Sequence, residues 1–533
     1  MAIQDIAPSA SGSPSPAPPR RRSESLNPAT GEVWRTYEPT PADEVRRAVA
    51  RAREAQREWA ARPVRERARV LERFRRALYR RRLEVADLIS RENGKPAAEA
   101  LGTEVSVVLD YARFYARKAP GALRGSWFTP SSLAMWRKRV RIGYEPYGVV
   151  AVVSPWNYPF MLAGGVMLPA LVAGNAVVLK PSEFTPTTGM LLGDLAAEAG
   201  VPAGVMTVIP GDGATGASLV GADVNKVFFI GSVATGKRVA AACAERLIPC
   251  SLELGGSDPA IVLDDADVRH AAAGIAWGRF SNAGQTCVAP KRVFVVDAVY
   301  EAFAAELRRV VEGLRVAPAG GAACDVGPLI RPSQADELRA QLQDALDRGA
   351  HVLARGSLTG EHGGGFVAPT VLEGVTAEMR VMREETFGPL LPVVRVRDAD
   401  EAVRLANASE FGLSASVWGR NRRRATAVAE RIEAGSVAIN DSIIVAGMAE
   451  VPHGGVKSSG TGRSHGIAGL MECVRTKTIV ADAIPGLRQP WWFGYDAEHP
   501  ANIDAAVRLA HGSGVLERVR SVGRVVRMLL RAR

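Results

Sequence analysis

Cysteine is scarce in this chain of 533 residues, and the five cysteines form no CxxC pair and no metal-ligand spacing. An odd and sparse set argues against a disulfide scaffold and favours a reducing compartment. The N-terminus, MAIQDIAPSASGSPSPAPPRRR, lacks the apolar core of a signal peptide, and its Pro/Ser-rich composition predicts a disordered tail over residues 1–24. We therefore expect a cytoplasmic protein without disulfides.

Long apolar runs are also missing, because none reaches the roughly 18 residues that a membrane-spanning helix needs. The most apolar stretch, residues 163–179, is interrupted by Pro169, Gly174 and Asn175, and it predicts a helix, a turn and a buried strand. A GxGxxG fingerprint in its usual place after a strand is absent as well. Any nucleotide site must therefore be sought in other residues.

The net charge of +11 is unevenly placed. Residues 46–82 hold fifteen arginines against four glutamates, with helical spacing and few aromatics, which favours a solvated helix face over a nucleic-acid site. Residues 514–533 hold six arginines against one glutamate and predict a basic amphipathic helix. Such a helix either lies on an anionic membrane or packs its apolar side on its own globule, and we expect the second.

The length predicts at least two domains, since one hydrophobic core rarely extends so far. Amphipathic helices are expected at 41–61, 63–92 and 96–119. Apolar strand-like segments such as GVVAVVSP, NAVVLKP and NKVFFIG then alternate with helical patterns, which predicts a parallel sheet covered on both faces. A second alternating stretch, from PAIVLDDAD to GSVAIND, predicts a second α/β domain beyond a hinge near residues 254–256.

Two short segments carry the residues that catalysis would need. Cys287 lies in SNAGQTCVAP, where small neighbours let a substrate carbon approach the sulfur, and Glu253 lies in SLELGG, followed by two glycines. A cysteine nucleophile needs a base to clear its covalent intermediate, and this pair supplies both. In FIGSVATGK, Gly231 and Ser232 follow a strand and form a weak phosphate-binding signal.

Taken together and in order, seven segments resemble the aldehyde dehydrogenase superfamily over roughly residues 25–482. The segments are SPWNYP (154–159), GNAVVLKPSE (174–183), FIGSVATG (229–236), LELGG (252–256), GQTC (284–287), EETFGP (384–389) and HGGVKSSGTGR (453–463). The resemblance implies that an aldehyde is oxidised to its acid with NAD(P) as hydride acceptor, because a protein needs a cofactor for hydride chemistry.

The resemblance also assigns catalytic roles by position. Cys287 matches the nucleophile that forms a thiohemiacetal and then a thioester. Asn157 matches the residue that, with the backbone N–H of Cys287, stabilises the oxyanion, a contribution on the order of 3 kcal/mol per donor. Glu253 matches the residue that activates water to hydrolyse the thioester, and its presence favours hydrolysis over transfer to coenzyme A.

Further positions match the family's cofactor contacts. Lys180 and Glu183 match those that bind the adenosine ribose, and a carboxylate there favours NAD over NADP. Glu385 matches the residue that holds the nicotinamide ribose, and Phe387 matches the ring beside the nicotinamide. Gly231 and Ser232 match the pyrophosphate contact. The remaining cofactor-binding candidates are Trp156, Ser182, Gly213 and Leu254.

The resemblance implies an α/β architecture in separate parts. A Rossmann-like NAD-binding domain is expected at 25–133 and 148–254, a catalytic domain at 255–445, and a C-terminal extension at 483–533. Residues 134–147 and 456–482 would form a small oligomerisation hairpin whose exposed strand extends the sheet of a second copy. A homodimer is expected, with a tetramer as the alternative and no nucleic-acid partner.

The substrate is less defined than the reaction. The similarity to bacterial enzymes favours succinic semialdehyde, with aromatic or long-chain aliphatic aldehydes as alternatives. Met161, Trp156 and residues 443–445 predict an apolar entrance, and no arginine that would bind a substrate carboxylate is identified. Where relatives often read PFGG, this chain has His453, which we expect to be structural, as is His465.

Two other classes of protein remain as alternatives. A thiol hydrolase would use Cys287 and Glu253 but would leave Lys180, Glu183 and Glu385 without a role. A non-catalytic structural or nucleic-acid-binding relative would use the basic segments and would not need Cys287, Glu253 and Asn157 together. Reduction of NAD in the presence of aldehydes separates these alternatives from the dehydrogenase.

Overall fold

The computed structural model describes residues 22–132, 135–319, 324–358, 365–484, 486, 489 and 491–530. Most of the tail expected at 1–24 lies outside these residues, but its last part is a strand, β1 (Ser23–Leu26), paired with β2 (Val33–Tyr37), so disorder was the wrong prediction there. Contacts divide the chain into two units: Met1–Ala119 with Tyr147–Cys473, and Pro120–Pro146 with Val474–Arg533.

The first sheet of the larger unit has six strands in the order β19-β9-β8-β5-β6-β7. All neighbours are parallel except β19, which runs antiparallel to β9. The strands are β5 (Val149–Val153), β6 (Ala176–Lys180), β7 (Met206–Val208), β8 (Lys226–Ile230), β9 (Cys250–Glu253) and β19 (Gly460–Thr461). The predicted helix, turn and strand over 163–179 are confirmed as α6 (Pro159–Ala173) and β6.

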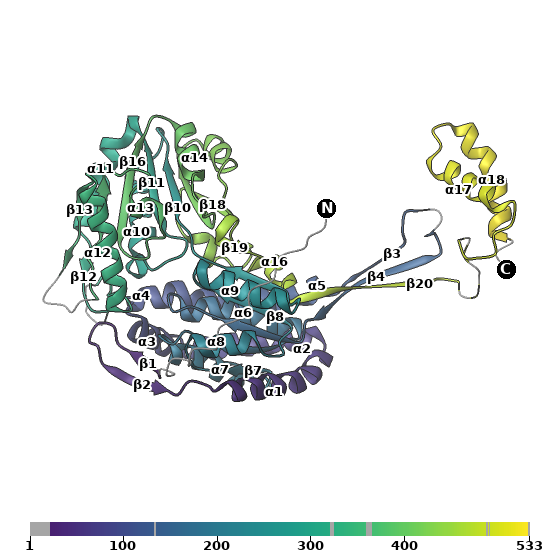
Figure 1. The fold of residues 1–533 in the computed structure, drawn as a ribbon, viewed down its shortest axis with the longest axis horizontal. Coiled ribbons are helices and arrows are strands. Elements are labelled where there is room, and N and C mark those ends of the chain that lie inside the picture. The colour runs from purple at the N-terminus through teal and green to yellow at the C-terminus, as the bar shows by residue number, and fades with distance from the viewer. Residues whose placement is uncertain are drawn as a thin grey trace, which may run out of the picture. The chain divides into compact units, whose positions relative to one another are not determined.

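The second sheet has seven strands in the order β13-β15-β16-β11-β10-β17-β18, and its pairs are parallel except for the one at the β13 edge. They are β10 (Asp258–Val262), β11 (Pro290–Val296), β13 (His351–Arg355), β15 (Thr370–Glu373), β16 (Leu390–Val396), β17 (Ser414–Trp418) and β18 (Ser436–Ile439). Figure 1 shows the first sheet among purple and blue helices and the second among teal and green ones. The predicted α/β class with parallel sheets is confirmed.

The strands are apolar along their whole length because helices cover both faces of each sheet. In the first sheet, Val149, Ala151 and Val178 pack with Val45 and Ala48 of the helix α1 (Ala42–Ala61) in one core cluster. Nucleotide and substrate sites form at the carboxyl ends of such strands, and here Asn157 follows β5 and Glu253 ends β9. Cys287 instead lies in the loop before the amino end of β11, in the second sheet, and the fold brings it to the same cavity as the other two.

One predicted helix is divided. The pattern over 63–92 predicts a single helix, whereas the structure has α2 (Val64–Arg80) and α3 (Arg82–Asn93), because Arg81 leaves the helical conformation at φ −97° and ψ 10°. Gly94 ends α3 with a left-handed φ of 91°. The segment expected at 96–119 is α4 (Ala97–Glu99), the π-helix η1 (Ala100–Val105) and α5 (Ser106–Ala122).

The remaining helices connect or follow the strands. In the larger unit they are α1 (Ala42–Ala61), α7 (Pro186–Glu198), α8 (Gly213–Val220), α9 (Val233–Glu245), α10 (Val268–Phe280), η3 (Ser281–Gly284), α11 (Asp297–Glu312), α12 (Pro332–Asp347), α13 (Arg380–Arg383), α14 (Ala399–Asn407), α15 (Arg422–Ala429), η4 (Ile444–Gly447), η5 (Lys457–Ser459) and α16 (Gly466–Met471). A short parallel pair joins β12 (Arg315–Val316) and β14 (Ser357–Leu358).

The second unit contains a three-stranded antiparallel sheet, β20-β4-β3, and two helices. Its strands are β3 (Ser126–Phe128), β4 (Lys138–Pro146) and β20 (Val474–Asp482). The expected hairpin, 134–147 with 456–482, is therefore wrong at two bounds: a strand precedes residue 134, and residues 456–473 belong to the larger unit. The helices are α17 (His499–His511) and α18 (Val515–Leu530). Within the described residues, none of the helices combines the length and the apolar character that crossing a bilayer requires.

Candidate active site

Cys287 follows a strained turn between α10 and β11. Asn282 and Ala283 have left-handed φ values of 51° and 53°, and Gly284 has a φ of 73°. A side chain at Gly284 would not fit, because its Cβ would lie 2.5 Å from the backbone carbon of Gly388. The small residues before the cysteine are therefore needed for the turn that presents the sulfur. The sequence had suggested a different reason, namely access of a substrate carbon to the sulfur.

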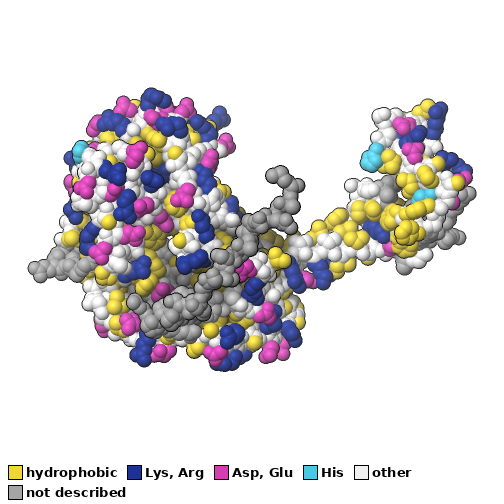
Figure 2. All heavy atoms as spheres, in the orientation of Figure 1, with side chains coloured by type: hydrophobic (Ala, Val, Ile, Leu, Met, Phe, Trp, Pro, Cys, Tyr) yellow, Lys and Arg dark blue, Asp and Glu magenta, His cyan; other side chains and the backbone are white. Residues whose placement is uncertain are grey.

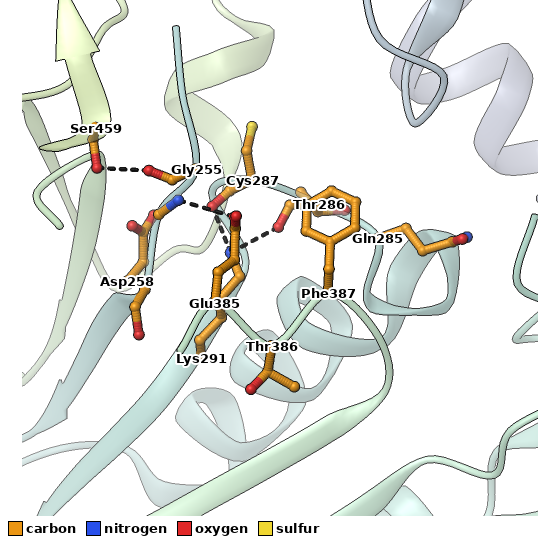
Figure 3. A network of polar contacts seen from close by, with 12 residues as sticks. Gly255, Asp258, Gln285, Thr286, Cys287, Lys291, Glu385, Thr386, Phe387 and Ser459 are labelled. Atoms are coloured by element: carbon orange, nitrogen blue, oxygen red, sulfur yellow. Dashed lines mark hydrogen bonds and ion pairs between the residues drawn. The ribbon is translucent and has the colours of Figure 1, made fainter. Parts of the chain in front are cut away.

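A buried lysine fixes the backbone on the other side of the sulfur (Figure 3). Lys291 Nζ donates to the carbonyl oxygens of Thr286 at 2.9 Å and of Cys287 at 2.6 Å, and it lies 3.8 Å from Glu385 Oε1. Glu385 Oε1 in turn accepts from the N–H of Gly256 at 2.9 Å. This network ties the cysteine segment to the glycines after Glu253 and to the EETFGP loop.

Glu253 ends β9 and has few partners. Its side chain is 11% exposed, and Oε2 lies 3.9 Å from Nε2 of His453. Burial lowers the pKa of His453, although the charge of Glu253 acts against that shift, so the imidazole is neutral at pH 7. Glu253 therefore lies free of strong ion pairs, in contrast to Glu385, and its carboxylate is available to a water molecule.

The Asn157 side chain lies against the cysteine segment. Asn157 Nδ2 donates to the carbonyl of Gln285 at 3.1 Å, which uses one of its two N–H groups. The backbone carbonyl of Asn157 accepts from Lys95 Nζ at 2.9 Å, and Lys95 forms a fully buried ion pair with Glu104 at 2.6 Å. Glu104 Oε2 also accepts from the first N–H groups of α6, including that of Met161.

The surrounding protein holds the thiol in its protonated form. Burial raises the pKa of Cys287 to about 12, with Lys291 acting against the shift and the charge of Glu253 adding to it. Among the described residues, the backbone N–H of Cys287 has no protein acceptor. This N–H and the second N–H of Asn157 are the donors available to an oxygen on a carbon bonded to the sulfur.

Two cavities meet at Cys287. The first, of about 200 Å³, holds the predicted residues Trp156, Asn157, Gly231, Ser232, Glu253, Leu254, Cys287, Glu385 and Phe387, together with His453 and Arg331. The second, of about 420 Å³, is lined mainly by apolar residues, among them Val107, Met161, Trp277, Val288, Ile443 and Ile444. Of the residues expected at an apolar entrance, Met161, Ile443 and Ile444 line this second cavity, Trp156 lines the first, and Val445 lines neither.

The other cofactor candidates, Lys180, Ser182, Glu183 and Gly213, are not among the residues that line the first cavity. Lys180 is the buried last residue of β6, and its Nζ lies 3.4 Å from Glu183 Oε2, which also accepts from Ser182 Oγ at 3.4 Å. Gly213 begins α8, where Asp212 caps the helix. Burial lowers the pKa of Lys180, and the charges of Glu183 and Asp212 act against that shift. These residues therefore form one group at the ends of neighbouring strands.

Comparison with known proteins decides what this arrangement belongs to. The model of the aldehyde dehydrogenase family matches residues 16–479. The chain belongs to this family. It is 39% identical over 470 residues to the 4,4'-diapolycopene aldehyde oxidase of Methylomonas sp., covering 88% of this chain and 87% of that protein.

Other relatives agree on the family. The succinate-semialdehyde dehydrogenase [NADP(+)] of Deinococcus radiodurans is 39% identical over 474 residues, which are 87% of this chain and 96% of that one. The solved lactaldehyde dehydrogenase of Escherichia coli has a TM-score of 0.82 and 33% identity over 87% of this chain and 96% of the other. This aldehyde dehydrogenase is therefore an NAD(P)-dependent oxidoreductase that acts on aldehydes.

The first cavity fits the dinucleotide that the family uses. Parallel strands β8 and β9 end at it, with Gly231 and Ser232 before the N-terminus of α9, where backbone N–H groups favour phosphate. Among the described residues, Nε of Arg331 is buried without a hydrogen-bond partner, although Arg331 lines this cavity. The Arg331 guanidinium lies over the Phe184 ring at 4.9 Å, and its free Nε–H in a cavity that also holds a helix N-terminus is suited to an anionic ligand.

Sequence reasoning missed several residues that shape the site of this aldehyde dehydrogenase. Lys95, Glu104, Lys291 and Arg331 were not singled out, and His453 was expected to be structural only. The signal for Lys291 is its position: a lysine at the start of the apolar strand PKRVFVV must be buried with partners. No comparable signal marks Arg331, whose place depends on how distant segments meet.

Proposed function

We propose that this aldehyde dehydrogenase converts an apolar, uncharged aldehyde and water into the carboxylic acid, with NAD as the preferred hydride acceptor. The observation that carries the proposal is the position of Cys287 at the meeting of a polar cavity, which contains Glu253 and Asn157, and an apolar one. One cavity has the residues that catalysis and a dinucleotide need, and the other has the surface that an apolar chain or ring needs.

In the first step the Cys287 sulfur, as thiolate, attacks the aldehyde carbon and forms a thiohemiacetal. The thiol proton is released to the solvent, and it is the proton that the overall oxidation of the aldehyde produces. Asn157 Nδ2 and the Cys287 N–H stabilise the negative oxygen, and the bond from Asn157 to the Gln285 carbonyl keeps the amide oriented before substrate arrives. When bound, NAD supplies the acceptor for the hydride that leaves this carbon, and a thioester remains on Cys287.

Glu253 then acts as general base on a water molecule. Its carboxylate is available because, among the described residues, its one ion-pair contact is His453 Nε2 at 3.9 Å, and burial lowers the pKa of that imidazole. The activated water attacks the thioester carbon, the carbon–sulfur bond breaks, and the acid leaves. The leaving thiolate of Cys287 takes up the proton that Glu253 removed from the water.

NAD is proposed over NADP because of Glu183. Its carboxylate would accept a bond from the ribose 2′-hydroxyl of NAD and would repel the 2′-phosphate of NADP. The name of the Deinococcus relative specifies NADP(+), which favours the opposite preference, but Lys180 is already paired with Glu183 here. Lys180, Ser182, Glu183, Gly213, Gly231 and Ser232 would hold the adenosine and phosphates, and Trp156, Leu254, Glu385 and Phe387 the nicotinamide ribose and ring.

The apolar class of substrate is favoured by the lining of the second cavity. No lysine or arginine is among the described residues that line it, and its acidic member, Glu99, would repel a substrate carboxylate when ionised. Burial raises the pKa of Glu99 to about 7, so its charge increases across neutral pH. The diapolycopene aldehyde oxidase relative agrees with an apolar substrate, whereas the succinate-semialdehyde dehydrogenase relatives favour succinic semialdehyde.

Absorbance at 340 nm with NAD and a panel of benzaldehyde, octanal and succinic semialdehyde tests the substrate class. We expect kcat/KM for the apolar aldehydes to exceed that for succinic semialdehyde by about tenfold or more. A preference for succinic semialdehyde would overturn the substrate assignment and leave the reaction intact.

The role of Glu253 is tested separately by Glu253→Gln. We expect one rapid turnover of NAD reduction, followed by an acyl adduct on Cys287 that intact-protein mass spectrometry detects. Cys287→Ser serves as the control that shows neither the burst nor the adduct. Unchanged steady-state turnover in Glu253→Gln would remove Glu253 from the mechanism.

We also propose a cytoplasmic homodimer. All five cysteines are free, which supports a reducing compartment. β20 is an edge strand of nine residues with mostly exposed side chains, including Ile479 and Val480, and such an edge can pair with a second copy. Sedimentation analysis tests the assembly: a monomer would contradict it, and a tetramer would show that two dimers associate.

A further inference from the structure

The two helices at the C-terminal end of the described chain have no part in the proposed catalytic site. Both α17 and α18 lie beyond residue 479, where the match to the family model ends. They pack on each other through buried residues that include Ala505 of α17 and Ser521 and Val525 of α18. The other faces of α18 are exposed.

One exposed face of α18 is apolar. Val515, Val519, Val522 and Val526 follow each other at spacings of four, three and four residues, which places them on one side of the helix. They are 81%, 63%, 42% and 47% exposed, and Leu516 beside them is 65% exposed. Within its own unit this stripe is not covered by α17, since the buried residues of α18 lie on a different side of the helix.

Cationic and aromatic groups accompany this stripe. At 3.6 residues per turn, Arg518 lies on one side of the stripe and Arg520 and Arg527 lie on the other, all exposed. Glu517 is the one acidic residue among the described residues of α18. Trp492 and Phe493, in the segment before α17, are 54% and 86% exposed. Figure 2 shows hydrophobic side chains on the helical pair with Lys and Arg next to them.

We propose that α18, together with the aromatic segment before α17, binds the surface of an anionic phospholipid bilayer. An apolar stripe with arginines on both sides can bury its valines at the acyl boundary while the guanidinium groups reach lipid phosphates. Trp and Phe side chains are suited to the same depth. Nucleic acid would match the arginines but would leave the valines in water, so the charge and the apolar face together favour lipid.

This inference goes beyond the proposed function and does not depend on it. Docking on a bilayer would hold the enzyme where apolar aldehydes accumulate, whichever aldehyde it oxidises. Vesicle binding measures the inference directly and without turnover, so its failure would leave the proposed reaction and substrate class unaffected.

Flotation of the full-length protein with vesicles tests the proposal. We expect binding to vesicles of phosphatidylcholine with phosphatidylglycerol and much weaker binding to phosphatidylcholine alone. Raising the salt from about 0.1 M to about 1 M, where the Debye length falls from about 10 Å to about 3 Å, should release most of the protein. The double substitution Leu516→Asp with Val519→Asp should weaken binding by about tenfold or more.

Two further variants separate the contributions. Arg520→Gln with Arg527→Gln should weaken binding about fivefold per arginine and reduce the salt dependence. Leu247→Asp with Val352→Asp is the matched control, since both side chains are exposed in the larger unit, and it should bind vesicles as the wild type does. Circular dichroism confirms that each variant is folded.

Three results would overturn the proposal. The full-length protein could remain in the lipid-free fraction with anionic vesicles, or it could bind phosphatidylcholine vesicles equally well. In the third case, Leu516→Asp with Val519→Asp would change the mass of the assembly in sedimentation and leave vesicle binding unchanged, which would identify a second copy of the chain as the occupant of this face.

Discussion

The two cavities that meet at Cys287 are built from different chemistry. The first contains two carboxylates, Glu253 and Glu385, and the unpaired donor of Arg331, and it is held by the network around Lys291. The second has aliphatic and aromatic walls, and its acidic member, Glu99, accepts from the Asn282 N–H at 2.8 Å. Three residues line both cavities: Cys287, Leu162 and His453.

This difference separates two tasks that one cysteine must serve. Charge that develops on oxygen and on the cofactor needs fixed donors and a base, which are costly to bury unless they have partners. Selection of an aldehyde needs surface without such groups. Changes on the polar side should therefore alter the rate for every aldehyde or the choice of cofactor, and changes on the apolar side should alter the choice of aldehyde.

The largest effect is expected from Asn157→Ala. Loss of one oxyanion donor should lower kcat by about 10²-fold to 10³-fold for benzaldehyde and octanal alike, because the negative oxygen is common to both. Steady-state rates at saturating NAD measure this effect, and the ratio of kcat/KM between the two aldehydes serves as internal control. A loss confined to one aldehyde would assign Asn157 to substrate selection. It would then contradict the assignment of substrate selection to the apolar cavity alone.

The next effect concerns the apolar cavity. Ile444→Arg places a guanidinium near the sulfur, and a charge-assisted hydrogen bond of about 1.5–3 kcal/mol should raise kcat/KM for succinic semialdehyde relative to octanal by about tenfold to hundredfold. Ile444→Leu is the control that keeps the volume and should leave the ratio unchanged. The KM for NAD should stay as in the wild type. If the KM for NAD changed and the ratio between the aldehydes did not, Ile444 would affect cofactor binding and not the choice of aldehyde.

Local patterns were sufficient for much of the fold and for the candidates at the centre of the site. The alternation of apolar strands and helices predicts both parallel sheets, and the segments around Cys287, Glu253 and Asn157 place these residues at strand ends and turns. The two expected helices over 41–61 and 63–92 match α1 and the pair α2 and α3, apart from the break at Arg81. In these cases the determining interactions lie within a few residues of one another.

The supports of the site could not be predicted, because they join segments that are far apart. Lys95 reaches the Asn157 carbonyl across 62 positions, and His453 faces Glu253 across 200 positions. A charge pattern in the sequence gives no distance between such groups. The exposed stripe of α18 is similar: its periodicity is evident in the sequence, but whether the protein itself covers it depends on packing.

A smaller effect is expected for the cofactor. Glu183→Gln removes the negative charge near the 2′ position, so kcat/KM with NADP should rise about tenfold while the preference among aldehydes stays the same. Glu183→Asp retains the charge and should keep NADP disfavoured. Measuring both cofactors with one aldehyde checks the shift. Equal use of NAD and NADP by the wild type would show that Glu183 does not repel the phosphate.

The smallest effect tests how Glu253 acts on the resting sulfur. Because the pKa of Cys287 is raised to about 12, the thiolate fraction, and with it the rate of alkylation by iodoacetamide, should increase about tenfold per pH unit between about pH 7 and about pH 9. The charge of Glu253 adds to that raised pKa, so Glu253→Gln should lower the pKa of Cys287 and speed alkylation about threefold at a fixed pH, although the proposed mechanism expects the same change to stop thioester hydrolysis. Glu54→Gln, which removes an exposed carboxylate on α1, is the control and should leave alkylation unchanged.

Slower alkylation in Glu253→Gln would instead mean that this carboxylate withdraws the thiol proton, and the polar cavity would then activate the nucleophile as well as the water.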